Sequence, residues 1–264
     1  HLAARAGSKV SIFHRGKRPL ENLDEDLVAH LIKATKDLGI ELHLETEVTG
    51  IEKDGDLFTV ITKSPDGEEI HHTDLVVNAA GRVPELDNMN LEKVNISFSK
   101  KGIEVNEFLQ SVSNPTIYAA GDAADSKGLN LTPVAVMEGH IVAANIIRGN
   151  TKVPDYTEMP SAVFTLPTLA AVGMTEKQAK ASGIEHQVKS ASASNWYNAK
   201  RINESTYAFK VISDNEGSIL GAHIIGPHAE EMINLFAMAI RGKLKVADIR
   251  NMIYAYPSMG SEIR

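Results

Sequence analysis

The segment Thr116-Ile117-Tyr118-Ala119-Ala120-Gly121-Asp122-Ala123-Ala124 decides the fold of this chain. Its apolar run, residues 117–120, is typical of a buried strand in a parallel sheet. Open α/β sheets bind ligands at the carboxyl ends of their strands, and Gly121 and Asp122 follow at that end. Gly121 would let the backbone approach a ligand closely, and Asp122 can accept hydrogen bonds from hydroxyl groups. Taken alone, this pair is equally compatible with a plain turn.

A helix start follows this segment. Asn130-Leu131-Thr132-Pro133 opens a long helix, expected to run from residue 133 to residue 148, and a proline in the first turn is a common start signal. The first N–H groups of a helix and its positive end favour polar or anionic groups. These residues therefore either cap an ordinary helix or face a ligand.

The residues before this core are typical of a Rossmann domain with an insertion. Residues 1–7 have the composition of the last turns of a helix closed by a glycine, and a short strand is expected at 9–14. A helix end followed by a strand is the second half of a βαβ unit, so we expect the chain to begin inside a Rossmann domain; the alternative is a natural start with a short helix. The other expected elements are an amphipathic helix at 23–38, a strand at 40–44, an antiparallel meander at 48–53, 58–62 and 69–71, and a buried strand at 75–80.

The second half of the sequence is expected to contain an α+β region. Residues 149–154 form the clearest linker, and a short strand is expected before it at 103–105. Beyond the linker we expect strands at 162–165, 187–191, 207–213 and 219–225 and helices at 230–241 and 246–253.

The composition excludes several classes of function. The 264 residues carry 34 acidic and 27 basic side chains, a net charge of -7, so nothing indicates a nucleic-acid partner. The absence of cysteine excludes disulfides, thiol catalysis and thiolate metal sites in this chain, and we expect no bound metal. No apolar run approaches the roughly 20 residues that span a bilayer, and no signal peptide is visible, so we expect a cytoplasmic protein without a membrane partner.

Four ordered motifs carry a resemblance to a known family. Residues 79–84 read Ala-Ala-Gly-Arg-Val-Pro, and the Gly121-Asp122 segment follows them. Two further stretches are Pro160-Ser161-Ala162-Val163-Phe164-Thr165-Leu166-Pro167, continued by Val172-Gly173-Met174-Thr175-Glu176, and Gly221-Ala222-His223-Ile224-Ile225-Gly226-Pro227, followed by Glu230-Glu231-Met232-Ile233. Together they resemble the class I pyridine nucleotide-disulfide oxidoreductases, the group of glutathione reductase, mercuric reductase and dihydrolipoamide dehydrogenase.

The resemblance implies the domain organisation and the partners. The fold class is α/β plus α+β: a partial NAD(P)-binding Rossmann domain at 1–82, the C-terminal half of an FAD-binding domain at 83–153 and a dimerisation domain at 154–264. In this family each active site is completed across a two-fold axis, so the resemblance implies a homodimer. It also implies FAD and NADPH or NADH as cofactors and a small molecule or small disulfide as electron acceptor.

The resemblance further assigns roles to individual residues. Asp122, after Gly121, would hold the ribityl hydroxyls of FAD. The helix start at 130–132 would face the flavin pyrimidine edge and favour the anionic reduced flavin. Gly81, Arg82 and Val163 would line the nicotinamide side.

The choice between NADPH and NADH depends on residues 13–18. The second strand of a Rossmann domain ordinarily ends in an acidic residue that holds the ribose of NAD, whereas an arginine there accommodates the 2′-phosphate of NADP. Here the strand ends in His14-Arg15, and Lys17 and Arg18 follow, which favours NADPH. The alternative is a solvated basic loop, and Glu21 stands where family members use a second arginine.

The C-terminus departs from the family pattern. Disulfide reductases of the family carry a His-Pro-Thr stretch and a downstream glutamate, and the histidine shuttles protons to the redox thiols. Here Tyr256 occupies the histidine position, and Glu262 is displaced by one residue. A tyrosine, with an ordinary pKa near 10, is a poor shuttle at neutral pH. His223 and His228 do not compensate, because a strand histidine and a loop histidine are expected to be structural or exposed.

Three functions stay open from the sequence. In the first, a flavin oxidoreductase passes electrons from NAD(P)H to an acceptor other than a dithiol-linked disulfide. In the second, cysteines upstream of this chain support reduction of a small disulfide or a metal ion. In the third, the chain is a dimerisation module without catalysis, since the two glycine-rich phosphate loops of the family are absent. We expect the 264 residues alone to be inactive and to retain no flavin tightly.

Overall fold

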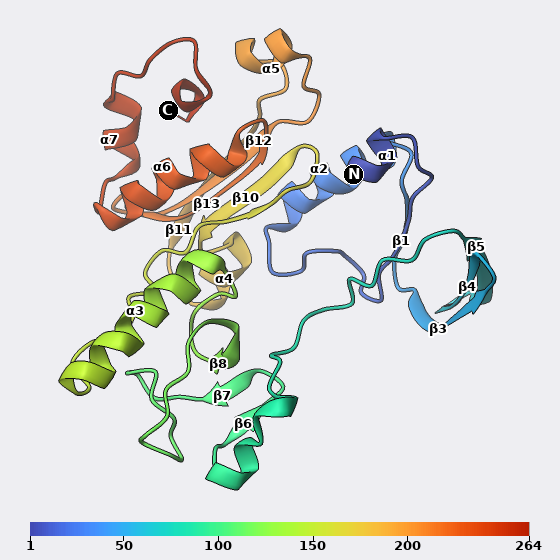
Figure 1. Ribbon diagram of the computed structural model, residues 1–264. Coiled ribbons are helices and arrows are strands. Elements are labelled where there is room, and N and C mark those ends of the chain that lie inside the picture. Colours follow the sequence, from blue (N-terminus) through green and yellow to red (C-terminus); the bar gives the residue numbers. More distant parts are fainter. Residues whose placement is uncertain (264) are drawn as a thin grey trace. The chain divides into compact units, whose positions relative to one another are not determined.

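The computed structural model describes residues 1–263, which form two compact units (Figure 1). Unit 1 consists of residues 1–78 and 160–263, and unit 2 consists of residues 79–159. Each unit has buried hydrophobic clusters of its own. None of the described helices is long and apolar enough to cross a membrane.

A five-stranded antiparallel sheet organises unit 1. Its strand order is β11-β12-β13-β10-β9. The bounds are β9 Ser161–Val163, β10 Thr168–Gly173, β11 His186–Ser192, β12 Ala208–Asp214 and β13 Ile219–Gly226. The four strands expected from the sequence in this region are confirmed within a few residues, whereas β10 was not expected. It consists mainly of small residues, and it pairs antiparallel both with β9, which directly precedes it in the chain, and with the distant strand β13.

Helices cover both faces of this sheet (Figure 1). Helix α6 (Ala229–Arg241) packs on the face that contains Ala170 and Ile224. Helix α2 (Glu25–Asp37) packs on the face that contains Leu169 and Ile225. Successive strand residues point to opposite faces, so the sheet separates the two helices. Shorter helices complete this part: α4 Glu176–Ala181, α5 Tyr197–Ile202, α7 Val246–Asn251 and the 3-10 turn η4 Met259–Glu262.

The N-terminal part of unit 1 forms the expected βαβ arrangement. Strand β1 (Ser11–Phe13) pairs in parallel with β2 (Glu41–His43), and α2 connects them. The Asp24 carboxylate caps α2 by accepting hydrogen bonds from two backbone N–H groups, and Gly39, with φ +76°, follows the C-cap. Before β1 lies the short helix α1 (Leu2–Arg5). The helix and the strands predicted between residues 1 and 44 are confirmed.

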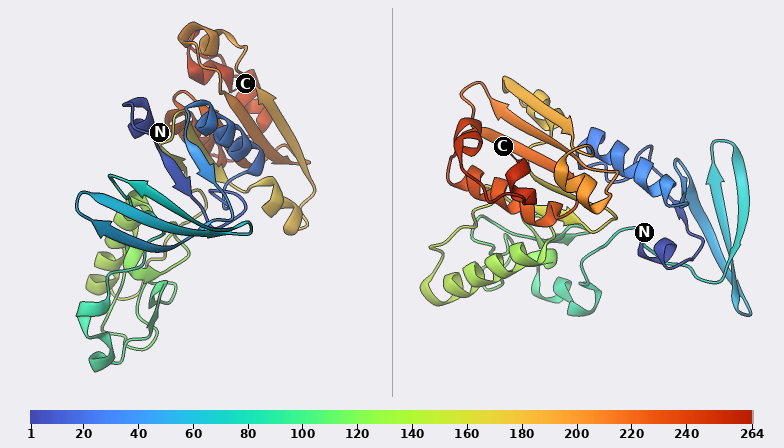
Figure 2. Two further views of the ribbon diagram at one scale, coloured as in Figure 1. Left: turned by 90° about the vertical axis from the view of Figure 1, so that its right-hand side faces the viewer. Right: turned by 90° about the horizontal axis from the view of Figure 1, so that it is seen from above.

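The meander predicted between residues 47 and 75 is also confirmed. Strands β3 (Glu47–Asp54), β4 (Leu57–Ser64) and β5 (Gly67–Thr73) form a three-stranded antiparallel sheet (Figure 2). Tight turns between the strands account for this register, because Asp54 pairs with Leu57 and Ser64 with Gly67.

Two strands expected from apolar runs are absent from the described residues. Residues 75–79 form no strand, and Leu75 and Val77 are exposed by 70% and 77%. A strand requires a neighbouring strand, and the parallel sheet of β1 and β2 has no third strand among the described residues. At 117–120 only an isolated bridge forms, between Gln110 and Tyr118. Both runs carry the expected β propensity, but propensity does not supply a partner.

Unit 2 is built from one small sheet and one long helix. The sheet order is β6-β7-β8, with bounds Phe98–Ser99, Gly102–Glu104 and Ala124–Asp125. Helix α3 (Thr132–Arg148) confirms the long helix predicted at 133–148. Short 3-10 turns lie at Asp87–Met89, Leu91–Val94 and Gly121–Ala123. The core contains Leu86, Leu91, Ile96, Ile103, Ala119 and Ala124.

Candidate functional site

The turn at Gly121 and Asp122 lies in unit 2, directly before β8. Gly121 has φ +64°, a left-handed conformation that a side chain strains. A Cβ atom at this position would lie 2.8 Å from the Cβ of Ala135 on α3. The residue is therefore glycine for two reasons, its backbone angle and its close approach to the helix. Asp122 follows with its side chain 47% exposed.

Arg82 bridges this turn and the start of α3. Its Nη1 donates to Oδ2 of Asp122 at 3.1 Å, and its Nη2 donates to the carbonyl oxygen of Asn130 at 3.3 Å. The structure thus brings together three residues singled out from the sequence. Arg82 was predicted on the nicotinamide side, and its contacts in unit 2 are with residues predicted to face the flavin. Gly81 beside it has φ +119° and open space where a side chain would be.

No described side chain caps the start of α3. Its N-cap residue, Leu131, has extended backbone angles and an apolar side chain that accepts no hydrogen bond. Thr132 and Pro133 form the exposed beginning of the first turn. The positive end of this helix therefore has no side-chain acceptor of its own, which is the condition under which a helix start can receive a polar group.

Sequence reasoning missed a buried carboxylate behind the turn. Glu138 on α3 is fully buried and accepts hydrogen bonds from Gly121 N–H, Ser126 Oγ and the Tyr156 hydroxyl. A glutamate in an amphipathic helix is ordinarily read as a solvent-exposed residue. In the sequence, the only indication that Glu138 is buried is its position one helical turn after the apolar residues at the start of α3.

The basic loop after β1 is ordered by its own hydrogen bonds. His14 Nε2 donates to the carbonyl oxygen of Arg18, and the Arg18 guanidinium donates to the carbonyl oxygens of Glu21 and Leu23. Arg18 therefore holds the loop together. Arg15 and Lys17 are exposed, and neither makes an ion pair with any residue that the structure describes.

Tyr256 and Glu262 occupy different environments. The Tyr256 side chain is 70% exposed, and its ring lies 6.0 Å from the ring of Tyr197. Glu262 Oε1 accepts hydrogen bonds from the backbone N–H of Asn198 at 3.3 Å and from its Nδ2 at 2.9 Å. The two predicted residues share no hydrogen bond among those of the described chain. Burial and the Glu262 carboxylate both raise the pKa of the neighbouring Tyr207.

The remaining candidates lie at single, separate positions. Val163 ends β9, pairs with Leu169 and is half-buried. His223 is buried on β13 and its Nε2 donates to the carbonyl oxygen of Met174, so the expectation of a structural histidine is confirmed. Among residues 1–263, no three histidine or acidic side chains are arranged to hold a metal ion.

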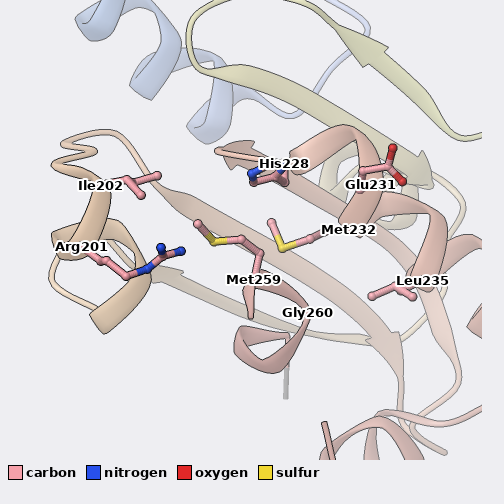
Figure 3. A pocket seen from close by; sticks show the side chains of 8 residues that line it. All are labelled: Arg201, Ile202, His228, Glu231, Met232, Leu235, Met259 and Gly260. Carbon is pink, nitrogen blue, oxygen red and sulfur yellow. The ribbon is translucent and has the colours of Figure 1, made fainter. Parts of the chain in front are cut away.

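An open pocket of about 450 Å³ lies beside the C-terminal segment in unit 1 (Figure 3). The side chains of Met232 and Met259 lie next to one another in its middle, with Arg201 on one side and Glu231 on the other. The pocket is completed by Ile202, His228, Leu235 and Gly260. Among its lining residues on α6, Met232 is buried and Leu235 is 40% exposed.

Comparison with known proteins places these features in one family. The family model for pyridine nucleotide-disulphide oxidoreductases matches residues 1–139, and the model for the dimerisation domain of the same family matches residues 159–264. An uncharacterized 19.7 kDa protein in a mercuric resistance operon of Staphylococcus aureus is 52% identical over 176 residues, covering 66% of this chain and 98% of that protein.

Larger relatives match nearly the whole chain. Glutathione reductase of Burkholderia cepacia is 31% identical over 97% of this chain and 56% of its own length, and mercuric reductase of Lysinibacillus sphaericus is 31% identical over 98% and 47%. The solved structure of the HOCl-induced flavoprotein disulfide reductase RclA of Escherichia coli superposes with a TM-score of 0.85 at 27% identity, covering 98% of this chain and 59% of that one.

The chain spans about half the length of the reductases that it matches. The expected resemblance is confirmed, and so is the mixed α/β fold class. The chain belongs to the pyridine nucleotide-disulphide oxidoreductase family, whose members are FAD- and NAD(P)H-dependent oxidoreductases.

Proposed function

We propose that this chain supplies the flavin-facing, NADPH-binding and dimer-forming parts of an oxidoreductase that takes a hydride from NADPH. One observation carries the proposal. The Gly121–Asp122 turn, the start of α3 and Arg82 meet in unit 2 as a single polar cluster. Within it, Asp122 and the helix start present an acceptor and donors, and we propose that these face the flavin.

The residues of this cluster fit the flavin in three respects. One Asp122 oxygen is bound by Arg82, while the other has no hydrogen bond among the described residues and can accept from ribityl hydroxyls. Gly121 lets the turn pack closely against Ala135 of α3, which keeps Asp122 near the start of that helix. The start of α3, at 130–132, offers N–H groups and a positive end to the pyrimidine edge, which favours the anionic reduced form. When bound, FAD supplies hydride acceptance and electron transfer.

We infer NADPH as the electron donor, with NADH as the alternative. Arg15 and Lys17 are exposed on a loop ordered by His14 and Arg18, so two cations are available for a 2′-phosphate at small cost in ordering. Gly81, Arg82 and Val163 stay proposed for the nicotinamide side. In the complete gene product, the double variant R15A/K17A should raise KM for NADPH at least tenfold and leave KM for NADH unchanged. An equal change for both nucleotides would contradict the assignment.

A homodimer formed by the dimerisation domain is part of the proposal. Apolar side chains are exposed on and after α6, with Leu235 40%, Met238 70% and Ile253 99% exposed. A second copy of this chain would bury such a surface, and a two-fold interface uses the same patch on both copies. Size-exclusion chromatography with light scattering tests this, and a monomer at micromolar concentration would contradict it.

The proposed acceptor is one that needs no histidine proton shuttle. Tyr256 stands in the histidine position, and Glu262 is bonded to Asn198, so neither supports the usual proton transfer to redox thiols. The test is NADPH-dependent reduction of glutathione disulfide by the complete gene product. Turnover close to that of an ordinary glutathione reductase would overturn this part of the proposal.

Reduction of a metal ion is the second candidate. It is favoured by the 52% identical protein in a mercuric resistance operon and by the match to a mercuric reductase. Because this chain has no cysteine, the thiols would come from residues outside it. NADPH oxidation that depends on added Hg²⁺ distinguishes this candidate from the first. Its absence, with an active flavin present, would exclude it.

By themselves the 264 residues are proposed to dimerise without catalysis. No two glycines in the sequence are separated by a single residue, so the G-x-G turn that cradles a dinucleotide pyrophosphate is missing. The purified chain should therefore be colourless and catalytically inactive. A yellow preparation with stoichiometric flavin would contradict this.

A further inference from the structure

A buried carboxylate in unit 2 lies directly behind the proposed flavin turn. Glu138 is 0% exposed. Its Oε2 accepts the Gly121 N–H at 2.6 Å, and its Oε1 accepts Ser126 Oγ at 2.7 Å and the Tyr156 hydroxyl at 2.5 Å. A carboxylate removed from water is stable only where hydrogen bonds replace its hydration, and three donors do so here.

The residues around Glu138 leave space for its carboxylate and supply its hydrogen-bond donors. A Cβ on Gly128 would lie 2.8 Å from Glu138 Oε1, so a glycine lets the loop close over the carboxylate. The Gly128 N–H donates to Ser126 Oγ, which in turn donates to Glu138. Burial and the bond to Glu138 raise the pKa of Tyr156 to about 12, so this phenol stays protonated and remains a donor at neutral pH.

Only one of the three donors belongs to the flavin-facing turn. Gly121 immediately precedes Asp122, and its left-handed backbone sets the direction in which the chain leaves the turn. Glu138 also lies on α3, the helix whose start forms the rest of the proposed site. The Gly121–Glu138 hydrogen bond therefore fixes the position of Asp122 relative to residues 130–132, although Glu138 itself is enclosed by protein.

We propose that Glu138 is a positioning residue of the flavin site, which holds the Gly121 amide so that Asp122 meets the flavin hydroxyls together with the start of α3. This inference rests on the proposed flavin function. It assigns a role to a residue that touches neither flavin nor substrate, and acts through the turn.

Two substitutions separate the hydrogen bond to Gly121 from the charge. In E138Q the amide oxygen can still accept from Gly121 N–H, and the amide nitrogen can donate to the Ser126 and Tyr156 hydroxyls, which also act as acceptors. In E138M the shape is nearly kept, but no acceptor remains for Gly121. Y156F is the matched control, because it removes one hydrogen bond from the same carboxylate and leaves the Gly121 bond in place.

The first readout is FAD affinity, measured by titrating apoprotein of the complete gene product with FAD. We expect E138M to raise Kd at least tenfold, and E138Q and Y156F to stay within threefold of the wild type. An E138M protein that is folded by circular dichroism and binds FAD like the wild type would overturn the inference. So would E138Q binding as weakly as E138M, because the retained Gly121 bond would then be irrelevant.

The second readout needs no flavin and covers the case in which E138M does not fold. Amide hydrogen exchange of Gly121 in the 264-residue chain should be slow in the wild type and in E138Q. Exchange at the rate of an unbonded amide in the folded wild type would overturn the Glu138 bond directly. A wild-type gene product that binds no FAD while Gly121 is protected would instead overturn the proposed function, and with it the flavin role of Glu138.

Discussion

Replacing Lys210 by methionine tests whether a buried ion cluster stabilises unit 1. Lys210 lies on β12 and is 2% exposed. Its ammonium group lies 3.0 Å from Asp24, 2.5 Å from Asp26 and 3.1 Å from Glu176. Burial by itself lowers the pKa of Lys210, but the hydrogen bonds to these three carboxylates outweigh it and raise the pKa. The lysine is therefore charged in the folded protein and fastens the N-terminus of α2 to the sheet.

The structure sets the size of the expected effect. Methionine replaces most of the aliphatic stem of the lysine, so the loss is mainly electrostatic. Removing one member of a buried ion pair costs about 3–5 kcal/mol, because the other charge stays buried without compensation. Here that charge is Asp24, 3% exposed, which still accepts hydrogen bonds from the N–H groups of Asp26 and Leu27. We therefore expect K210M to lower the free energy of unfolding by about 3 kcal/mol, the lower limit of this range.

Urea unfolding followed by tryptophan fluorescence measures this loss. Trp196 is the only tryptophan of the sequence and belongs to unit 1, like Lys210. The centres of its ring and of the Phe209 ring lie 5.5 Å apart. The control D26N removes a partner that is 66% exposed and should cost at most about 1 kcal/mol. The double variant D24N/K210M removes both buried charges, keeps a capping side chain and should recover most of the stability. A loss below about 1 kcal/mol for K210M, or no recovery in the double variant, would refute the reasoning.

Three other predictions concern single positions. G121A should destabilise unit 2 by about 2 kcal/mol, because Gly121 has a positive φ and lies against α3. Gly139 lies on α3 with open space where a side chain would be, so G139A should instead stabilise the protein by up to about 1 kcal/mol. Urea unfolding followed by circular dichroism measures both changes. Burial lowers the pKa of His223, so the unfolded chain binds a proton that the folded chain does not, and stability should fall as the pH falls below the ordinary value of 6.5. H223Q should lose less stability between pH 7 and pH 5, about the range of histidine titration, and an equal loss would contradict this. Y256F should change the unfolding free energy by less than about 0.5 kcal/mol, since the side chain is largely exposed, and a larger loss would reveal an unrecognised contact.

The elements that the sequence predicted are those with local signals. Helix α2 has an aspartate cap, an apolar stripe and a terminal glycine within 16 residues, from Asp24 to Gly39. The β3–β5 meander has alternation and tight turns, and α3 has a proline in its first turn. In each case neighbouring residues contain the whole pattern. For the run at 75–80 and for strand β10, the neighbouring residues do not contain the whole pattern, because pairing with a distant strand decides whether such residues form a sheet.

The same distinction applies to the candidate site. The Gly121–Asp122 turn was predicted from consecutive residues, although the strand expected before it, at 117–120, forms only an isolated bridge. Asn198 and Lys210 were not predicted, because their partners are remote: Asn198 binds a residue 64 positions away, and Lys210 binds Asp24 across 186 positions. A polar residue between apolar ones looks like a solvent-exposed position until the fold brings its partner to it.

The C-terminal departure from the family pattern depends on the carboxylate as much as on the tyrosine. A histidine–glutamate dyad requires the two side chains to share a hydrogen bond. Glu262 Oε1 already accepts hydrogen bonds from the backbone and side chain of Asn198, which leaves only its buried Oε2. The position one residue closer to Tyr256 is Ser261, which is buried and donates to the carbonyl oxygen of Ser258. Because Glu262 lies one position beyond the family glutamate and its Oε1 is held by Asn198, we expect that restoring histidine at 256 alone does not rebuild the dyad. For this reason we propose that the oxidoreductase to which this chain contributes transfers electrons without the proton shuttle of the disulfide reductases, and that a single substitution does not convert one into the other.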